Sequence, residues 1–138
     1  VNQSNSFASI EVDKYHVLYK RLSWLPERLV PPKDGYTTPD DSHPMLILAG
    51  SGASTNHVFR SAHYAHMLVH GVQKWIVTPP TVSRTTRSPM RWDVARETSQ
   101  LKCTLQSGDI LVLPALWSSA YRSKGESIAF SRRFIWKQ

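Results

Sequence analysis

The stretch GDILVLPALW, residues 108–117, combines a turn signal, a short apolar run and a proline-bounded end. Glycine followed by aspartate favours a tight turn, because glycine adopts positive φ readily and the aspartate side chain accepts hydrogen bonds from the nearby backbone. The run Ile110–Leu113 that follows is too short for a helix and has the length of a strand. A second stretch, MLVHGVQKWIVTPP at residues 67–80, repeats this arrangement, with Gly71 between two apolar runs. Short strands joined by glycine turns are therefore predicted.

Outward from these two stretches, the sequence after Pro44 consists of short apolar runs separated by turn residues. Runs of this length and spacing are typical of a β-sandwich or barrel. Residues 79–99 interrupt the pattern with prolines and arginines, and predict a long basic loop or a short helix near Trp92. The expected strands are Met45–Ala49, His66–Val69, Trp75–Val77, Leu101–Leu105, Ile110–Leu113 and Ser127–Trp136.

The first 43 residues have a different texture. From Asp13 to about Leu29, apolar residues recur at steps of three and four, which predicts a short amphipathic helix with Asp13 as its N-cap. Four prolines then mark residues 31–44 as a connector. We therefore expect residues 1–43 to form a polar tail, this helix and a proline-rich connector, and residues 44–138 to form the barrel.

The composition is that of one water-soluble globular domain. The chain has 138 residues, 41% of them hydrophobic and 20% charged, enough for one core and too few for two full-sized domains. Its longest apolar run, Ile110–Trp117, is far below the roughly 20 residues that cross a bilayer. A single cysteine, Cys103, excludes an internal disulfide framework, and we expect it to be buried in a strand. This cysteine usage favours a reducing intracellular compartment, or an organelle matrix such as the mitochondrial one if a leader preceded Val1.

Basic residues exceed acidic ones and give a net charge of +7, which favours encounter with anionic surfaces such as RNA or an acidic protein. Arginine beside exposed aromatic residues binds phosphates and stacks bases. The same residues also fit a solvated face with its aromatics turned into the core, and both interpretations stay open. The predicted contact residues are Arg84, Arg87 and Arg91 in the long loop, and Arg122, Lys124, Arg132 and Arg133 near the end of the chain.

Four segments, in order, resemble the Jumonji C (JmjC) branch of the cupin superfamily. Gly50–His57 is similar to the approach to that family's first metal histidine, and Met67–Pro80 to its strand, glycine turn and double proline. Cys103–Trp117 resembles the turn, strand and Pro-x-x-Trp pattern before the second metal histidine, and Ser127–Ser131 the closing strand. The resemblance covers residues 44–136. It implies a mostly β, double-stranded β-helix (cupin or jelly-roll) fold, and a family whose members are typically Fe(II)- and 2-oxoglutarate-dependent oxygenases.

The resemblance also implies where a metal site would lie. The family holds iron with two histidines and one carboxylate, and the matching positions here are His57, Phe59 and Ser119. A phenyl ring at position 59, facing the barrel interior, is expected to fill the space of an iron-bound carboxylate. The co-substrate anchor region carries Gln73, with Lys74 one residue on and facing the other side of the strand. We therefore predict a degenerate site and no cofactor.

Clustered histidines offer a different metal site. His57, His63 and His66 could hold zinc or iron if residues 63–66 formed a helical turn. On a strand, His66 and His70 share a face and His63 points away. The alternative is that these histidines cap loops or line a polar surface.

Three functions follow, and the sequence leaves all three open. The first is a catalytically degenerate JmjC-like cupin that serves as a structural or interaction subunit in an assembly with RNA or acidic proteins. The second is an active oxygenase that hydroxylates a protein or nucleic acid with Fe(II) and 2-oxoglutarate, using His57 as a ligand. The third is a metal-free small-molecule binder with an apolar pocket bordered by Phe59, Trp75 and Ser119.

Overall fold

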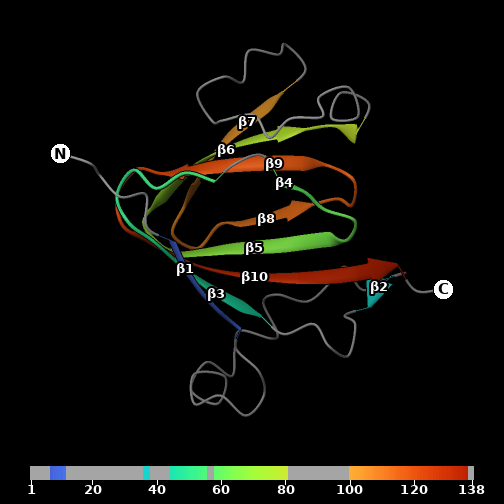
Figure 1. The fold of residues 1–138 in the computed structure, drawn as a ribbon, viewed down its shortest axis with the longest axis horizontal. Helices are drawn as coiled ribbons and strands as arrows, with labels where there is room; N and C mark the ends of the chain where they lie inside the picture. The colour runs from blue at the N-terminus through green and yellow to red at the C-terminus, as the bar shows by residue number, and fades with distance from the viewer. Residues whose placement is uncertain (1–6, 12–35, 38–43, 56–57, 81–99, 137–138) are drawn as a thin grey trace.

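The computed structural model describes residues 7–11, 36–37, 44–55, 58–80 and 100–136. These residues form two antiparallel β-sheets (Figure 1), which confirms the mostly β, double-stranded fold. Among them, no helix is long and apolar enough to span a membrane. The helix expected from Asp13 to about Leu29 lies outside the described residues. The strands are β1 (Phe7–Glu11), β2 (Tyr36–Thr37), β3 (Met45–Ala49), β4 (Val58–Phe59), β5 (His63–His70), β6 (Val72–Thr78), β7 (Leu101–Gln106), β8 (Ile110–Leu113), β9 (Ser118–Ser123) and β10 (Ser127–Trp136).

The chain alternates between the two sheets. The larger sheet has the order β1-β3-β10-β5-β8, with β2 paired to β10, and the smaller sheet has the order β4-β9-β6-β7. From β4 onward, each strand lies in the opposite sheet to the strand before it, except that β7 stays beside β6. In Figure 1 the smaller sheet lies above the larger one. The space between them is the interior of the barrel.

Two glycine turns make these crossings tight. Gly71 lies between β5 and β6 with φ +95°, and Gly108 precedes β8 with φ +96°, as the sequence predicts. The Asp109 carboxylate accepts a hydrogen bond from the amide of Gln106 at 2.7 Å. The amide of Gly108 donates to the carbonyl of Leu68 at 2.7 Å, which ties this turn to β5.

Alternate side chains of both sheets fill the interior. Because neighbours on a strand point to opposite faces, the pairs Trp75 and Tyr121, and Val77 and Ser119, share the inner face of the smaller sheet. Partly buried hydrophobic residues pack around the central cluster. The buried cluster is Leu68, Trp75, Val77, Leu105, Leu113, Tyr121 and Ala129.

The observed strands differ from the expected ones in two ways. β3, β8 and β10 have the expected bounds, and β5, β6 and β7 are longer, whereas β1, β2, β4 and β9 were not indicated by apolar runs. β1 pairs with β3, so the larger sheet includes residues before 44, although the division of the chain at residue 44 stays a prediction. Cys103 is exposed rather than buried, because β7 is the last strand of its sheet.

Candidate functional site

Four buried polar side chains meet inside the barrel. Gln73 of β6 pairs with Ser123 of β9, and residues directly opposite each other share a face. His66 of β5 and Ser127 of β10 reach the same space from the larger sheet. Gln73 and Ser123 are fully buried, and Ser127 and His66 are 2% and 3% exposed. Groups buried to this degree need internal hydrogen-bond partners.

Gln73 is the centre of the resulting network. Its Oε1 accepts a hydrogen bond from Nε1 of Trp75 at 3.2 Å and lies 2.9 Å from Nε2 of His66. Since an indole nitrogen is only a donor, this oxygen is the acceptor and His66 carries its hydrogen on Nε2. The amide nitrogen of Gln73 donates to Oγ of Ser127 at 3.0 Å, and that oxygen lies 2.7 Å from Oγ of Ser123. The network therefore bridges the two sheets.

The surroundings keep His66 neutral. Desolvation by burial lowers its pKa to about 4, a hydrogen bond to Gln73 opposes that change, and the charge of Arg60 adds to the lowering. The imidazole lies 4.7 Å from the Trp75 ring, which stacks on Tyr121 at 4.6 Å. Burial also raises the pKa of Tyr121 to about 12, with Arg60 opposing. The interior is therefore an uncharged, aromatic environment at neutral pH.

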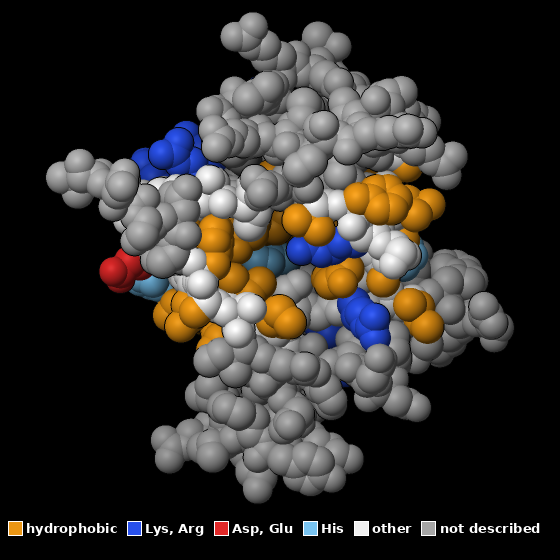
Figure 2. All heavy atoms as spheres, viewed as in Figure 1, with side chains coloured by type: hydrophobic (Ala, Val, Ile, Leu, Met, Phe, Trp, Pro, Cys, Tyr) orange, Lys and Arg blue, Asp and Glu red, His pale blue; other side chains and the backbone are white. Residues whose placement is uncertain are grey.

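Arg60 places a cation at the border of this interior. Its Nη1 donates to Oγ of Ser119 at 3.3 Å, and its guanidinium carbon lies 4.7 Å from the centre of the Tyr64 ring, a cation–π geometry. Its carbonyl accepts a hydrogen bond from the amide of Leu116 at 2.8 Å. Figure 2 shows the molecule from the side seen in Figure 1. Near the middle of that view, Lys or Arg side chains lie among hydrophobic ones, with His close by. Sequence reasoning missed Arg60, because only the pairing of Val58 with Ser119 brings it here.

The positions that match the family's metal ligands do not converge among the described residues. His57 lies outside them. Val58 pairs with Ser119 and Phe59 with Ser118, so Ser119 and Phe59 lie on opposite faces of the sheet. Ser119 is buried at 3% exposure, whereas Phe59 is 53% exposed. The expectation that Phe59 fills the barrel interior is therefore wrong, because the register turns its ring outward.

The residues of the co-substrate anchor region separate across β6. Gln73 is fully buried, and its carbonyl oxygen is already shared by His66 and Trp75. Lys74 is exposed on the outer face. Neither residue offers an unengaged charged group to the interior.

The described members of the histidine cluster, His63 and His66, do not come together either. His63 and His66 both lie on β5, three residues apart, and therefore on opposite faces. His63 accepts a hydrogen bond from the amide of Ala115 at 3.0 Å and stacks on Phe134, whereas His66 is bound to Gln73. Within the described part of the chain, no three His, Cys, Asp or Glu side chains are placed to hold a metal ion. The helical arrangement that a His57, His63 and His66 site requires is replaced by a strand.

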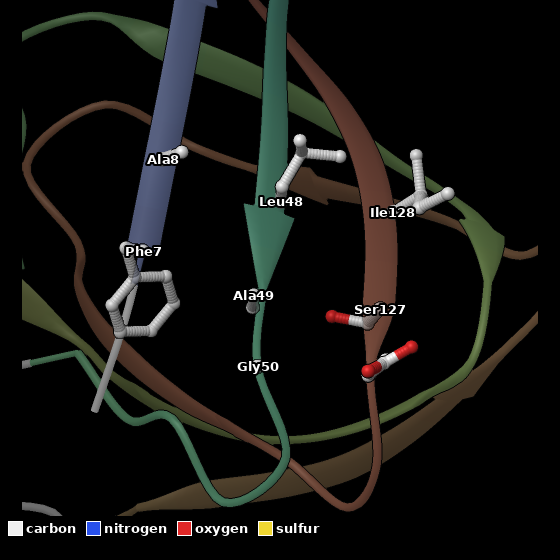
Figure 3. A pocket seen from close by; sticks show the side chains of 8 residues that line it. Phe7, Ala8, Leu48, Ala49, Gly50, Ser127 and Ile128 are labelled. Atoms are coloured by element: carbon white, nitrogen blue, oxygen red, sulfur yellow. The ribbon is translucent and has the colours of Figure 1, made fainter. Parts of the chain in front are cut away.

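The pocket expected beside Phe59, Trp75 and Ser119 is not formed by those residues, since Phe59 faces away from the other two. A different pocket of about 370 Å³ lies over β1, β3 and β10. Figure 3 shows it between the ends of these strands, with Leu48 beside its strand partner Ile128. Apart from Ser127 and the carboxylate of Glu126, its lining is apolar or glycine.

The basic residues fall on different surfaces. Arg84, Arg87 and Arg91 lie outside the described residues. Arg132 and Arg133 are partly buried on β10 of the larger sheet. Lys124 is exposed and follows the end of β9. The smaller sheet carries a separate group of basic residues on its outer face. We define the basic face as Lys74, Lys102 and Arg122.

The pairing of the strands fixes the basic face. Lys74 of β6 lies directly opposite Arg122 of β9, and Lys102 of β7 lies opposite Ile76, the next residue on the same face of β6. All three cations are exposed. Sequence reasoning named Arg122 as a contact residue but did not place Lys74 or Lys102 beside it, because the three are distant in the chain.

Comparison with solved structures places the fold. YcfD, a ribosomal oxygenase from Escherichia coli, superposes with a TM-score of 0.53 and 14% identity over 70% of this chain. The chain spans only 23% of that protein's length. The CENP-C cupin domain of Drosophila melanogaster gives TM-scores of 0.52 and 0.51 in two structures, at 10% and 8% identity, over 76% of this chain and 72% and 73% of the domain. No protein-family model and no curated protein matches the sequence.

The chain therefore has the cupin, JmjC-like fold that its sequence motifs indicate. One expectation has to be corrected. The prediction of no cofactor is overturned by the likeness to a ribosomal oxygenase, because the same fold serves in an enzyme as well as in the CENP-C cupin domain.

Proposed function

We propose that this chain is a catalytically degenerate cupin domain that serves as an interaction subunit and binds an anionic partner. The observation that carries the proposal is the basic face. Like charges directly opposite each other across two strands destabilise a sheet, and Lys74 and Arg122 hold this arrangement on an exposed surface. A bound anion removes that cost, so the arrangement fits a surface that is covered by a negatively charged partner.

The border of the barrel interior supports an interaction role over oxygenase chemistry. The serine and the phenylalanine at two of the family's ligand positions face opposite sides of the sheet. The guanidinium of Arg60 is hydrogen-bonded to Ser119, so the side chain at this ligand position already has a partner within the protein. The interior polar groups are engaged with one another across the two sheets.

Binding of two anionic probes tests the proposal. Fluorescein-labelled polyglutamate and a labelled single-stranded RNA are titrated with the wild-type chain and with a Lys74→Gln, Arg122→Gln variant. The variant lacks two positive charges of the basic face. We expect it to bind the probe that resembles the natural partner about tenfold more weakly, which corresponds to about 1.4 kcal/mol. Added salt should weaken wild-type binding as well.

A matched control separates the basic face from net charge. The variant Arg132→Gln, Arg133→Gln removes the same charge from β10, and thermal melting checks that both variants fold. The affinity of this control variant for the probes is expected to lie within about threefold of the wild-type affinity. Equal weakening by both pairs would show that only net charge matters and would refute the proposal.

An oxygenase is the second candidate, favoured by the fold shared with a ribosomal oxygenase and by His57 in the sequence. It predicts stoichiometric iron in the purified chain and turnover of 2-oxoglutarate. His57→Ala should then abolish turnover. Turnover that depends on His57 would replace the interaction subunit as the function of this domain.

A further inference from the structure

The outer edge of β7 is open among the described residues. Within the described ranges, β7 is the last strand of the smaller sheet and pairs with β6 alone. It is the outermost labelled strand of that sheet in Figure 1. Four consecutive residues of the strand, from Leu101 to Thr104, are exposed, and Leu101 is 59% exposed. An exposed edge of this kind is a template for pairing with another chain.

The backbone of β7 shows which groups face that edge. The amide of Gln106 donates to the carboxylate of Asp109 at 2.7 Å, and its carbonyl accepts from the amide of Asp109 at 3.0 Å. Gln106 therefore directs both backbone groups away from β6. Since this direction alternates along a strand, Thr104 and Lys102 present their N–H and C=O groups to the open side. A peptide that pairs there finds two donors and two acceptors.

The two faces of the edge differ in chemistry. Lys102 and Thr104 belong to the outer face, which continues onto Lys74 and Arg122. Leu101 and Cys103 lie on the other face, opposite Val77 and Trp75. A strand added here would place alternate side chains beside cations and beside an apolar surface.

We propose that β7 captures an extended acidic peptide as an additional strand, with acidic side chains over the basic face and apolar ones over Leu101 and Cys103. This inference rests on the proposed binding of an anionic partner and names its chemistry. Main-chain pairing supplies affinity and the alternating side chains supply specificity. Lysine on an edge strand also prevents aggregation, but that role does not account for Lys74 and Arg122 on the two strands further in.

A single-stranded RNA fits the same charges less well. Bases need aromatic platforms beside the cations. Phe59, which pairs with Ser118, is the one aromatic residue among the described residues of this face. Ser118 is four residues along β9 from Arg122, roughly 13 Å away. The open backbone of β7 would also have no use in binding RNA.

The test uses the full chain and a capped heptapeptide of alternating valine and glutamate. Three further probes are a peptide of the same composition in block order, the alternating peptide with methylated glutamate amide nitrogens, and a labelled uridine oligonucleotide. Cys103 is the single cysteine of the chain, so its reaction rate with a thiol reagent reports the occupancy of β7 directly. The variants are Lys102→Gln, which removes charge at the edge, and Phe59→Ser, which removes the aromatic ring at the far end.

The alternating peptide is expected to bind and to slow the modification of Cys103 about fivefold or more. Methylation of its amides should weaken binding at least about tenfold, because the pairing donors are lost. Lys102→Gln should weaken binding several-fold and Phe59→Ser should leave it unchanged.

Other outcomes overturn the inference in distinguishable ways. Equal binding of the methylated or block peptide would show attraction by charge without strand pairing, and would leave the anionic partner in place. Binding of the oligonucleotide alone, weakened by Phe59→Ser, would assign the surface to nucleic acid. Failure of every anionic probe to bind would remove the proposed function together with this inference.

Discussion

At the residue scale, the stability of the barrel depends on a glutamine in the position of a core residue. Gln73 is fully buried and is hydrogen-bonded to His66, Trp75 and Ser127. Gln73→Leu keeps a side chain of similar volume but removes the hydrogen bonds of Gln73 to those three buried partners. We therefore expect the free energy of unfolding to fall by about 3 kcal/mol or more. Urea denaturation measures it, with exposed Lys74→Leu as the matched control on the same strand. A loss below about 1 kcal/mol would show that the network contributes little.

His66 makes the stability depend on pH. Its pKa is lowered from 6.5 to about 4 in the folded state, so the unfolded chain binds a proton more readily. The contribution of neutral His66 to the free energy of unfolding is fully present above pH 6.5 and is lost as the pH falls from 6.5 towards 4. We expect the wild type to be about 2 kcal/mol less stable at pH 5 than at pH 7.

His66→Asn isolates this contribution from the other histidines. Urea midpoints of the variant at the two pH values should differ much less than those of the wild type. Arg60→Met should raise the pKa of His66, because the Arg60 charge contributes to its lowering. The same slope in His66→Asn as in the wild type would assign the pH dependence to other groups.

At the scale of the elements, two glycines with nearly equal positive φ angles, Gly71 and Gly108, should respond differently to substitution. A Cβ at Gly71 would overlap the carbonyl oxygen of Glu126 and lie 2.9 Å from Cβ of Ser127, whereas one at Gly108 meets nothing within 4 Å. Both substitutions strain a positive φ, which costs about 1 kcal/mol or somewhat more. Gly71→Ala should therefore cost about 2 kcal/mol more than Gly108→Ala in thermal or urea unfolding. Equal costs would mean that the β9–β10 connection yields freely.

The elements also show what the sequence could predict. The sequence predicts strands with apolar runs and glycine turns, such as β3 and β8, with their observed bounds, because both signals are local. The sequence does not predict β9, because Ser118–Ser123 is rich in small polar residues. This segment becomes a central strand through its pairing with β4 and β6. The site follows the same rule. Gln73 was singled out by its motif, whereas Arg60 and the basic face depend on the register between strands that are distant in sequence.

At the scale of the whole molecule, the connectivity makes the two sheets unfold together. From β4 to β10 the chain crosses between the sheets at nearly every step, so each sheet is assembled from strands scattered along the sequence. The network around Gln73 joins β5 and β10 of one sheet to β6 and β9 of the other. We expect a single two-state transition, with coincident urea midpoints for far-ultraviolet circular dichroism and tryptophan fluorescence. Gln73→Leu should lower both midpoints equally; separate midpoints would show that one sheet persists without the other.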